Sequence, residues 1–203
     1  MLFYTDIETI PNDDWKMVPD PKKIVDDIFI KKVESYMRWQ QVQDAVVHHD
    51  GKETLDGIRR SKVHWMNNPE YQRQLTPIYK EVTTKVRALN DKYWRYVVDG
   101  WQAFQYTEYD ESYEGYYDWH MDDGPKHLVD DYYQRKISFS LGLNDADEFE
   151  GGELVIKFGI DEQSYKLSKG EVLIFPSYLV HKVTPVTKGL RKVIVGWGVG
   201  PRI

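Results

Sequence analysis

The half of the sequence after residue 100 restricts the fold most strongly, because it alternates short β-rich runs with turn residues. Aromatic and β-branched residues are frequent in the runs, whereas Gly, Pro, Asn and Asp mark the gaps between them. Eight short strands within about 100 residues are typical of a jelly roll or a small barrel. The predicted strands cover 101–109, 115–122, 135–143, 152–158, 164–167, 171–175, 179–186 and 190–199.

The first half of the sequence favours helices. Apolar residues recur at three- to five-residue spacing over 20–38, which predicts an amphipathic helix with Pro21 in its first turn. A second helix is predicted over 76–94, with Thr76 as its N-cap and Pro77 at its first helical position. Both helices would supply an apolar stripe that can cover one face of a sheet.

No linker separates the two halves, so we predict a single domain over 1–203. Its region 1–99 would be a helical support that also contains short strands near 41–47 and 58–65. Its region 100–203 would be the jelly-roll core. The predicted fold class is therefore α+β with a mainly β core, a cupin-like double-stranded β-helix packed against N-terminal helices.

The composition limits the chemistry and the partners. The chain has no cysteine, which excludes disulfides, zinc–thiolate sites, iron–sulfur clusters and a thiol nucleophile. Any metal must therefore be held by His, Asp or Glu. The net charge of −6 argues against a broad nucleic-acid surface, and no apolar run approaches the roughly 18 residues of a membrane span. The first ten residues contain no basic residue, so we expect no signal peptide and a cytoplasmic protein.

Two His-x-Asp motifs occur, and a single such motif carries little information. His48-His49-Asp50 falls within 48–51, which ends in Asp-Gly and predicts a solvated hairpin turn. The second motif, His120-Met121-Asp122, lies at the end of a predicted strand. In a strand, residues two apart point to the same face, so His120 and Asp122 can bind one ion together.

A third metal ligand has to come from another strand, and His181 is the candidate. It follows the turn at Pro176-Ser177, near the start of a late strand. Two histidines and one carboxylate on one face of a metal leave three coordination positions open. This arrangement is the one that non-haem Fe(II) oxygenases use.

Arg191 is the basic residue that could hold an anionic cosubstrate, because it begins the strand RKVIVGW. In that strand Arg191, Val193, Val195 and Trp197 share one face, and Lys192 points the other way. An inward-facing arginine among Val and Trp has lost solvent and needs a carboxylate partner, which its planar guanidinium fits.

Together these residues resemble the Fe(II)/2-oxoglutarate-dependent oxygenases, and within them the prolyl 4-hydroxylase-like branch. The resemblance covers roughly 100–199, with IRRSKVHW at 58–65 as a weaker similarity. The combination of His-x-Asp, a distal His, an Arg ten residues later and a Trp is more specific than any of its parts. The matching segments are 106–122, 135–143, 149–154, 170–176 and 181–197.

The resemblance implies a role for each matching residue. Three residues match the family's iron ligands: His120, Asp122 and His181. Arg191 matches the residue that pairs with the far carboxylate of 2-oxoglutarate. Ser138 matches a small hydroxyl position that lines the pocket, and Trp197 matches an aromatic wall.

A tyrosine hydroxyl on the cosubstrate is also implied, and its identity is open. Tyr109 matches best, but it lies two residues farther from the histidine than is usual, so Tyr106 and Tyr113 are alternatives. Some relatives place a tyrosine in the strand 135–143, where this sequence has Gly142.

The activity implied by the resemblance is hydroxylation of an unactivated C–H bond with succinate and CO₂ as coproducts. Its cofactors would be Fe(II), 2-oxoglutarate as cosubstrate, O₂ and ascorbate as reductant. Because Asp122 supplies the carboxylate that halogenating relatives lack, hydroxylation is favoured over halogenation. The expected substrate is a prolyl residue in a peptide or protein, with no nucleic-acid or membrane partner. The sequence does not define the oligomeric state.

Two other functions remain open at this stage. The substrate could instead be a free amino acid or another small molecule, since substrate loops vary freely on such folds. A more remote alternative is a cupin-like metal-binding module without redox turnover. The acidic run 144–150 is predicted to be a solvated loop, with a lip that attracts a basic peptide as the alternative.

Overall fold

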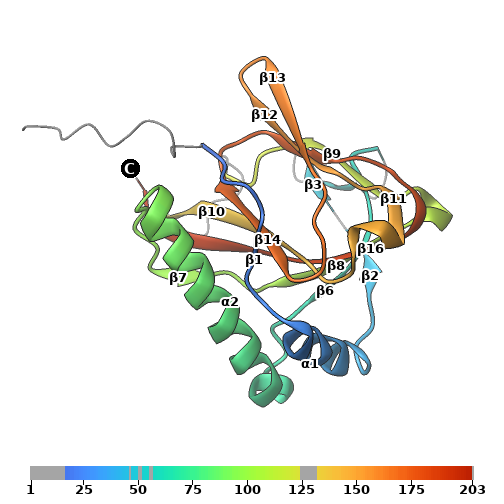
Figure 1. The fold of residues 1–203 in the computed structure, drawn as a ribbon, viewed down its shortest axis with the longest axis horizontal. Coiled ribbons are helices and arrows are strands. Elements are labelled where there is room, and N and C mark those ends of the chain that lie inside the picture. The colour runs from blue at the N-terminus through green and yellow to red at the C-terminus, as the bar shows by residue number, and fades with distance from the viewer. Residues whose placement is uncertain (1–16, 46, 50–51, 55–56, 124–131, 203) are drawn as a thin grey trace, which may run out of the picture.

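The computed structural model describes residues 17–45, 47–49, 52–54, 57–123 and 132–202. The described residues form two facing antiparallel sheets, and two helices cover the outer face of the larger one. Figure 1 shows α1 and α2 on one side of the larger sheet and β9, β12 and β13 of the smaller sheet on the other. The predicted fold class, a jelly roll packed against N-terminal helices, is confirmed.

The helices and strands have the following bounds. The α-helices are α1 (Asp27–Met37) and α2 (Gln72–Tyr93), and the 3-10 helices are η2 (Pro69–Tyr71), η3 (Glu111–Tyr113) and η4 (Ala146–Glu148). The strands of the first half are β1 (Lys22–Lys23), β2 (Gln43–Asp44), β3 (Val47–His49), β4 (Lys52–Thr54), β5 (Arg59–Arg60) and β6 (Lys62–Trp65). Those of the second half are β7 (Gly100–Trp101), β8 (Gln105–Asp110), β9 (Tyr116–His120), β10 (Tyr133–Gly142), β11 (Phe149–Gly151), β12 (Leu154–Phe158), β13 (Asp161–Tyr165), β14 (Glu171–Pro176), β15 (His181–Val183) and β16 (Val186–Pro201).

Both helices begin at residues other than those the sequence suggested. The side chain of Asp26 caps α1 by accepting from the Phe29 amide at 2.9 Å, so Pro21 lies ahead of the helix rather than in its first turn. Helix α2 begins at Gln72, and Thr76 lies inside it, where its hydroxyl donates to the Gln72 carbonyl. The threonine thus bonds back along the helix instead of capping it.

The first half contributes more to the sheets than the sequence indicated. Strand order in the larger sheet is β1-β14-β10-β16-β8-β6-β2, with β7 and β11 also paired to β16. The smaller sheet runs β13-β12-β15-β9-β5. Strands β1, β2 and β6 therefore extend the larger sheet, and β5 extends the smaller one. Strands β3 and β4 form the hairpin predicted around 48–51, whose tip residues 50–51 lie outside the described residues.

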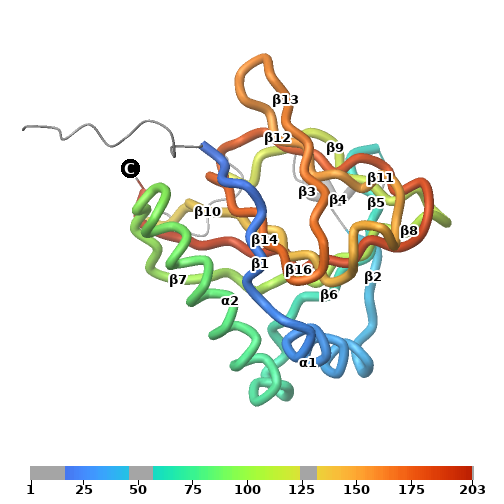
Figure 2. Tube along the Cα trace, in the orientation of Figure 1, coloured from blue at the N-terminus to red at the C-terminus, as the bar shows by residue number. Residues whose placement is uncertain are grey.

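Strand β16 organises the larger sheet. It is 16 residues long and pairs with β10, β8, β7 and β11. Arg191 lies opposite Tyr109 of β8, and Trp197 lies opposite Ser138 of β10. Figure 2 shows this strand running across the molecule between the helices and the smaller sheet. One continuous strand thus carries both Arg191, the predicted partner of the cosubstrate, and Trp197, the predicted aromatic wall of the pocket.

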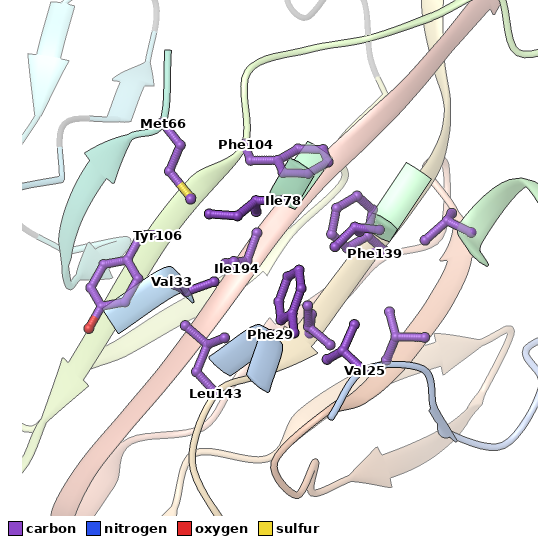
Figure 3. Packing of buried hydrophobic residues seen from close by; sticks show 14 of the residues in the cluster. Val25, Phe29, Val33, Met66, Ile78, Phe104, Tyr106, Phe139, Leu143 and Ile194 are labelled. Carbon is purple, nitrogen blue, oxygen red and sulfur yellow. The ribbon is translucent and has the colours of Figure 1, made fainter. Parts of the chain in front are cut away.

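The main apolar core lies between the helices and the larger sheet. Phe29, Val33 and Ile78 from the helices meet Phe139 and Ile194 from the sheet, all nearly inaccessible to solvent (Figure 3). A second apolar cluster fills the space between the two sheets. The first core fixes the sheet from behind, so its other face is free to form a pocket.

Replacing Phe104 by alanine should destabilise this core strongly. The Phe104 side chain is fully buried, stacks on Tyr79 with ring centroids 3.9 Å apart and meets Phe139 edge-on at 5.1 Å. Truncation of a buried Phe costs about 3–5 kcal/mol. Urea unfolding followed by circular dichroism should show this loss, and the exposed Trp39→Ala change is the matched control, expected within about 0.5 kcal/mol of the parent. Equal effects of the two variants would contradict the packing described.

None of the described helices is both long enough and apolar enough to cross a membrane.

Candidate metal centre and adjoining pocket

Three side chains meet at the inner face of the smaller sheet. His120 ends β9, His181 begins β15, and the two are direct partners in the register of these strands. Asp122 follows β9, and its amide donates to the Ser177 carbonyl at 3.0 Å. One possible ligand atom from each of the three lies within 4.8 Å of the others. The structure therefore brings together the three residues that the sequence proposed as metal ligands.

The backbone orients both imidazoles. Nδ1 of His120 lies 2.7 Å from the Asp118 carbonyl, and Nδ1 of His181 lies 2.9 Å from the Leu179 carbonyl. Because a carbonyl only accepts, each Nδ1 carries the proton and each Nε2 offers a lone pair. The Nε2 atoms lie 3.8 and 3.5 Å from the carboxylate oxygens of Asp122. This pattern is the one expected of histidines prepared to bind a metal.

The protonation of the cluster also suits a cation. Burial, with the neighbouring His181, lowers the pKa of His120 well below its usual range. Burial alone would raise the pKa of Asp122, but the two histidines and Arg135 outweigh it and lower the pKa. A neutral imidazole and an ionised carboxylate are the forms that ligate metals.

Ser138 supports the carboxylate from behind. Its Oγ lies 2.6 Å from Asp122 Oδ2 and 3.0 Å from Ser177 Oγ. A hydroxyl has one proton, so Ser177 donates to Ser138 while Ser138 donates to Asp122. Both serines are buried, which makes this chain of hydroxyls a fixed support for the carboxylate.

The Ser138→Ala variant should therefore weaken metal binding about 10- to 100-fold, the usual loss when the partner of a metal ligand is removed. Anaerobic equilibrium dialysis with Fe(II) measures this directly. Ser140→Ala is the matched control, since Ser140 lies on the same strand without contacting Asp122. A Ser138 variant with parental iron affinity would show that this hydroxyl does not support the ligand.

A pocket opens beside the three ligands. Its lining includes Arg191, Tyr109 and Trp197 in addition to the metal-ligand candidates. Most of the remaining wall is apolar, from Leu154, Phe175 and neighbouring residues. A pocket of this kind, with a few polar groups on an apolar wall, is typical of a small-molecule site.

Arg191 makes this a site for an anion. Its side chain is 3% exposed, and its guanidinium carbon lies 5.1 Å from the centre of the Tyr109 ring. Nη1 is buried without a hydrogen-bond partner, and no described carboxylate forms an ion pair with this arginine. Burial lowers its pKa, yet an arginine remains charged. Glu153 acts on this arginine only from beyond ion-pair distance, and a buried cation without a contacting carboxylate is costly, so a bound carboxylate would stabilise the protein.

Ser140 adds a second unpaired polar atom to the same pocket. Its Oγ is buried without a partner among the described residues, and the residue lines the pocket. Two orphaned polar groups and three converging ligand atoms in one pocket fit a metal with a small dicarboxylate. The donor set of the chain therefore suits Fe(II) and 2-oxoglutarate.

Gly152 leaves room for the aliphatic part of the Arg191 side chain, which passes close to its backbone. Its φ is +66°, and an added Cβ would lie 2.9 Å from Arg191 Cδ. Gly151 also has a positive φ, of +71°. The two glycines thus serve the geometry of the turn, and Gly152 also permits close packing against Arg191.

The structure separates the three tyrosines that the sequence left open. Tyr109 is buried and lines the pocket. Tyr106 lies on the opposite face of β8 and donates to Glu108, and Tyr113 donates to the Glu108 carbonyl. At Gly142 an added Cβ would lie 2.5 Å from the Ser168 carbonyl oxygen, so the backbone leaves no room for a side chain there.

Several pocket residues were not identified from the sequence. The pocket is also lined by Arg59 of β5, Gln105 of β8, Tyr117 of β9 and Ser140 of β10. The hydroxyl of Ser138, in contrast, donates to Asp122. The segment 58–65 carried a weak signal for Arg59, but only strand register shows that it reaches the pocket. Ser138 and Ser140 lie on the same face of β10. The alternation of the strand predicts this shared face, but it does not predict which serine contacts Asp122 and which one lines the pocket.

The acidic run 144–150 takes part in local ion pairs. Lys169 lies 3.3 Å from Asp145, and Lys188 lies 3.1 Å from Glu150. The pocket lining contains none of this run's carboxylates. Local lysines thus pair with two of the run's four carboxylates, and the alternative of an acidic lip that attracts a basic peptide stays a prediction.

Comparison with known proteins agrees with this geometry. The family model of the 2OG-Fe(II) oxygenase superfamily matches residues 104–198. A PKHD-type hydroxylase of Idiomarina loihiensis is 46% identical over 82 residues, which are 40% of this chain and 36% of the relative. A PKHD-type hydroxylase of Alteromonas mediterranea is 29% identical over 181 residues, 86% of this chain and 76% of the relative. The chain thus matches only about a third of the length of the first of these relatives.

Solved structures of prolyl hydroxylases share the fold. The enzyme of Trichoplax adhaerens, solved with a peptide fragment of the hypoxia inducible factor oxygen degradation domain, aligns with a TM-score of 0.69 at 16% identity, over 89% of this chain and 81% of that one. The viral collagen prolyl hydroxylase of Paramecium Bursaria Chlorella virus-1 gives 0.63 at 18% identity, over 93% and 97%.

Fold and site together define a jelly-roll protein with a facial arrangement of two histidines and one carboxylate beside an anion pocket. Over residues 104–198 the chain is similar to the 2OG-Fe(II) oxygenase superfamily, and the two relatives compared above are PKHD-type hydroxylases.

Proposed function

We propose that this protein is an Fe(II)- and 2-oxoglutarate-dependent dioxygenase that hydroxylates an unactivated C–H bond, as a prolyl hydroxylase acting on a peptide or protein. The observation that carries the proposal is the conjunction of three converging metal ligands with the buried, unpaired Arg191 in one pocket. A metal-binding module without turnover would not need that arginine, because no anion would have to be held beside the metal.

In this proposal His120, Asp122 and His181 hold the iron, and Arg191 binds the far carboxylate of 2-oxoglutarate through its planar fork. Tyr109 orients the guanidinium through its ring, and Ser140 donates its free hydroxyl to the cosubstrate. Trp197 closes the wall, fixed by the Arg135 guanidinium 4.0 Å above its ring. Iron bound there would supply the redox chemistry in which one oxygen atom of O₂ goes to 2-oxoglutarate, giving succinate and CO₂, and the other goes into the substrate C–H bond.

The chain's own share of catalysis is positioning. The backbone carbonyls of Asp118 and Leu179 hold both imidazoles in the metal-binding tautomer, and Ser138 holds the carboxylate. The apolar wall keeps water from the reacting groups. The peptide substrate and the use of ascorbate are proposed from the resemblance to prolyl hydroxylases, and a cytoplasmic location is proposed from the sequence.

The test measures succinate formation and substrate oxidation separately. Purified protein with Fe(II), 2-oxoglutarate and ascorbate is mixed with a panel of proline-containing peptides and free amino acids, and each product is weighed by mass spectrometry. A gain of one oxygen atom on a peptide, dependent on 2-oxoglutarate, supports the proposal. Oxidation of a free amino acid alone would reassign the substrate. Iron-loaded, folded protein that never forms succinate would overturn the enzymatic function.

A further inference from the structure

The pocket contains a second arginine that the iron and 2-oxoglutarate leave unused. Arg59 lies on β5, the edge strand of the smaller sheet, and lines the same pocket as Arg191. Its Nε donates to Ser61 at 2.7 Å and its Nη2 to Gln105 at 2.9 Å. Its guanidinium carbon lies 4.7 Å from the centre of the Tyr117 ring. The side chain is thus held in place from three directions.

Arg59 remains available to an anion in spite of these contacts. It is only partly buried, and its described partners are neutral groups: a hydroxyl, an amide oxygen and an aromatic face. Within the described part of the chain, no carboxylate forms an ion pair with it. No acceptor among the described residues bonds to its Nη1, so these hydrogens can serve an acceptor that enters the pocket. An arginine fixed by neutral groups is well prepared to bind a carboxylate.

Further cations lie on the outer face of the same sheet. In β9, Tyr117 and His120 line the pocket, so Tyr116 and Trp119, the residues directly before them, point outward. At least one basic side chain lies over each of these two aromatic rings. We name this surface the basic–aromatic face: Arg60, Tyr116, Trp119, Lys157 and Lys182.

The contacts within the basic–aromatic face are cation–π contacts. Arg60 lies 4.7 Å from the Tyr116 ring centre, and Lys157 and Lys182 lie 4.7 and 4.3 Å from that of Trp119. Only Lys157 has an acidic partner among the described residues, Glu162 at 3.6 Å. Asp118, exposed on the same strand, uses its carboxylate to accept from the Trp119 amide. The three cations outnumber the two nearby carboxylates, Glu162 and Asp118, by one, so the face carries a small positive charge on a chain whose net charge is −6.

The basic–aromatic face and the pocket lie on opposite faces of the smaller sheet, and both reach its edge strand β5, where Arg59 faces the pocket and Arg60 faces outward. Trp119 directly precedes the metal-ligand candidate His120, and Arg60 directly follows Arg59. From β5 through β9 and β15 to β12 there are three strand spacings, or about 14 Å, the length of roughly four extended residues. A segment bound across the outer face would reach the pocket by passing around β5, next to Arg59.

We propose that Arg59 and the basic–aromatic face together recognise an acidic peptide, with one carboxylate on Arg59 and its neighbours along the face. This inference rests on the proposed function, because it assigns the substrate class of the same pocket. Arg191 serves the cosubstrate, and Arg59 serves the substrate. Peptide is favoured over nucleic acid since the cations form a short patch on an acidic protein rather than a long basic track.

The test is direct binding by the full chain, anaerobically with Fe(II) and 2-oxoglutarate. Fluorescence anisotropy compares a labelled peptide with one central proline flanked by glutamates, the same peptide with glutamines, and single-stranded oligothymidine. The glutamate peptide should bind about tenfold more tightly than the glutamine peptide, and about 1 M salt should remove most of this difference. Equal affinities for the two peptides, or tighter binding of oligothymidine, would overturn the proposal.

Variants locate the binding surface. The double change Lys157→Gln with Lys182→Gln, at the outer face, should lower the affinity for the glutamate peptide about five- to tenfold. It should leave the affinity for the glutamine peptide unchanged. Lys31→Gln with Lys85→Gln, on exposed helix positions, alters the net charge equally and is the control. If both double variants lost the same affinity for the glutamate peptide, overall charge alone would attract the peptide and the proposed surface would be wrong.

Arg59→Gln tests the pocket arginine, with Arg59→Lys as the conservative variant. The glutamine variant should lose about tenfold in affinity for the glutamate peptide while its affinity for 2-oxoglutarate, from titration without peptide, stays at the parental value. Recovery in Arg59→Lys would show that charge is what matters. If the glutamate peptide binds but neither succinate nor hydroxylated peptide forms, the proposed function fails and acidic-peptide recognition stands.

Discussion

Asp122→Ala should abolish specific iron binding, with a loss of at least about 100-fold in Fe(II) affinity. The two imidazoles converge on the carboxylate, whose oxygens lie 3.8 and 3.5 Å from their Nε2 atoms. Removing the carboxylate leaves two neutral ligands and no negative charge to balance the cation. Since loss of a group that only supports a ligand already costs about 10- to 100-fold, loss of the ligand should cost more. Anaerobic equilibrium dialysis with Fe(II) checks this.

The sequence offers a matched control in its other His-x-Asp motif. Asp50→Ala removes an aspartate from the same local pattern, and we expect parental iron binding, because the sequence predicts a solvated turn there. Circular dichroism of both variants confirms that each is folded. If the Asp50 change lowered iron affinity as much as the Asp122 change, the assignment of the metal site to the second motif would be wrong.

Arg191→Met should raise the 2-oxoglutarate concentration needed for half-saturation by about 30-fold or more. Loss of one partner of a buried, hydrogen-bonded charge pair costs about 2–5 kcal/mol. Methionine has a similar length and no charge, so the pocket keeps much of its shape. Iron binding should remain close to the parental value, because the guanidinium is not among the ligand candidates.

A second readout of Arg191→Met does not depend on turnover. Without 2-oxoglutarate the variant should melt at the same temperature as the parent or higher, since it no longer buries an unpaired cation. The rise in melting temperature that 2-oxoglutarate gives the parent should disappear. Lys192→Met is the control, because Lys192 lies next along β16 and faces away from the pocket. A parental response of Arg191→Met to 2-oxoglutarate would refute the role of this arginine.

The site residues that could be predicted from the sequence are those whose chemistry is unusual for their local setting. His120 and Asp122 stand two apart at a strand end, and Arg191 stands on the apolar face of a strand. Each of these signals is local. The strands themselves follow from periodicity and turn residues, which is why the jelly roll was predictable.

The residues that could not be predicted reach the site through tertiary register. Arg59 lines the pocket only because β5 pairs with β9 at the level of Tyr117. Ser140 and Ser138 have identical local patterns, and only the position of Asp122 decides which hydroxyl becomes a support. His64 likewise bonds through its ring to Tyr36, whereas its neighbour Trp65 points the other way toward Trp197.

The length of β16 has a consequence for how the two halves of the site come apart. Arg191 and Trp197 belong to a 16-residue strand paired on both sides, whereas His181 belongs to a three-residue strand and His120 to one of five. Amide hydrogens over 191–197 should therefore exchange only through global unfolding, and those of the histidine strands through smaller, more frequent openings. Without metal, the protein should keep its anion-binding half ordered while its metal-binding half opens locally. A bound ion would therefore hold the short strands β9 and β15 of the smaller sheet together.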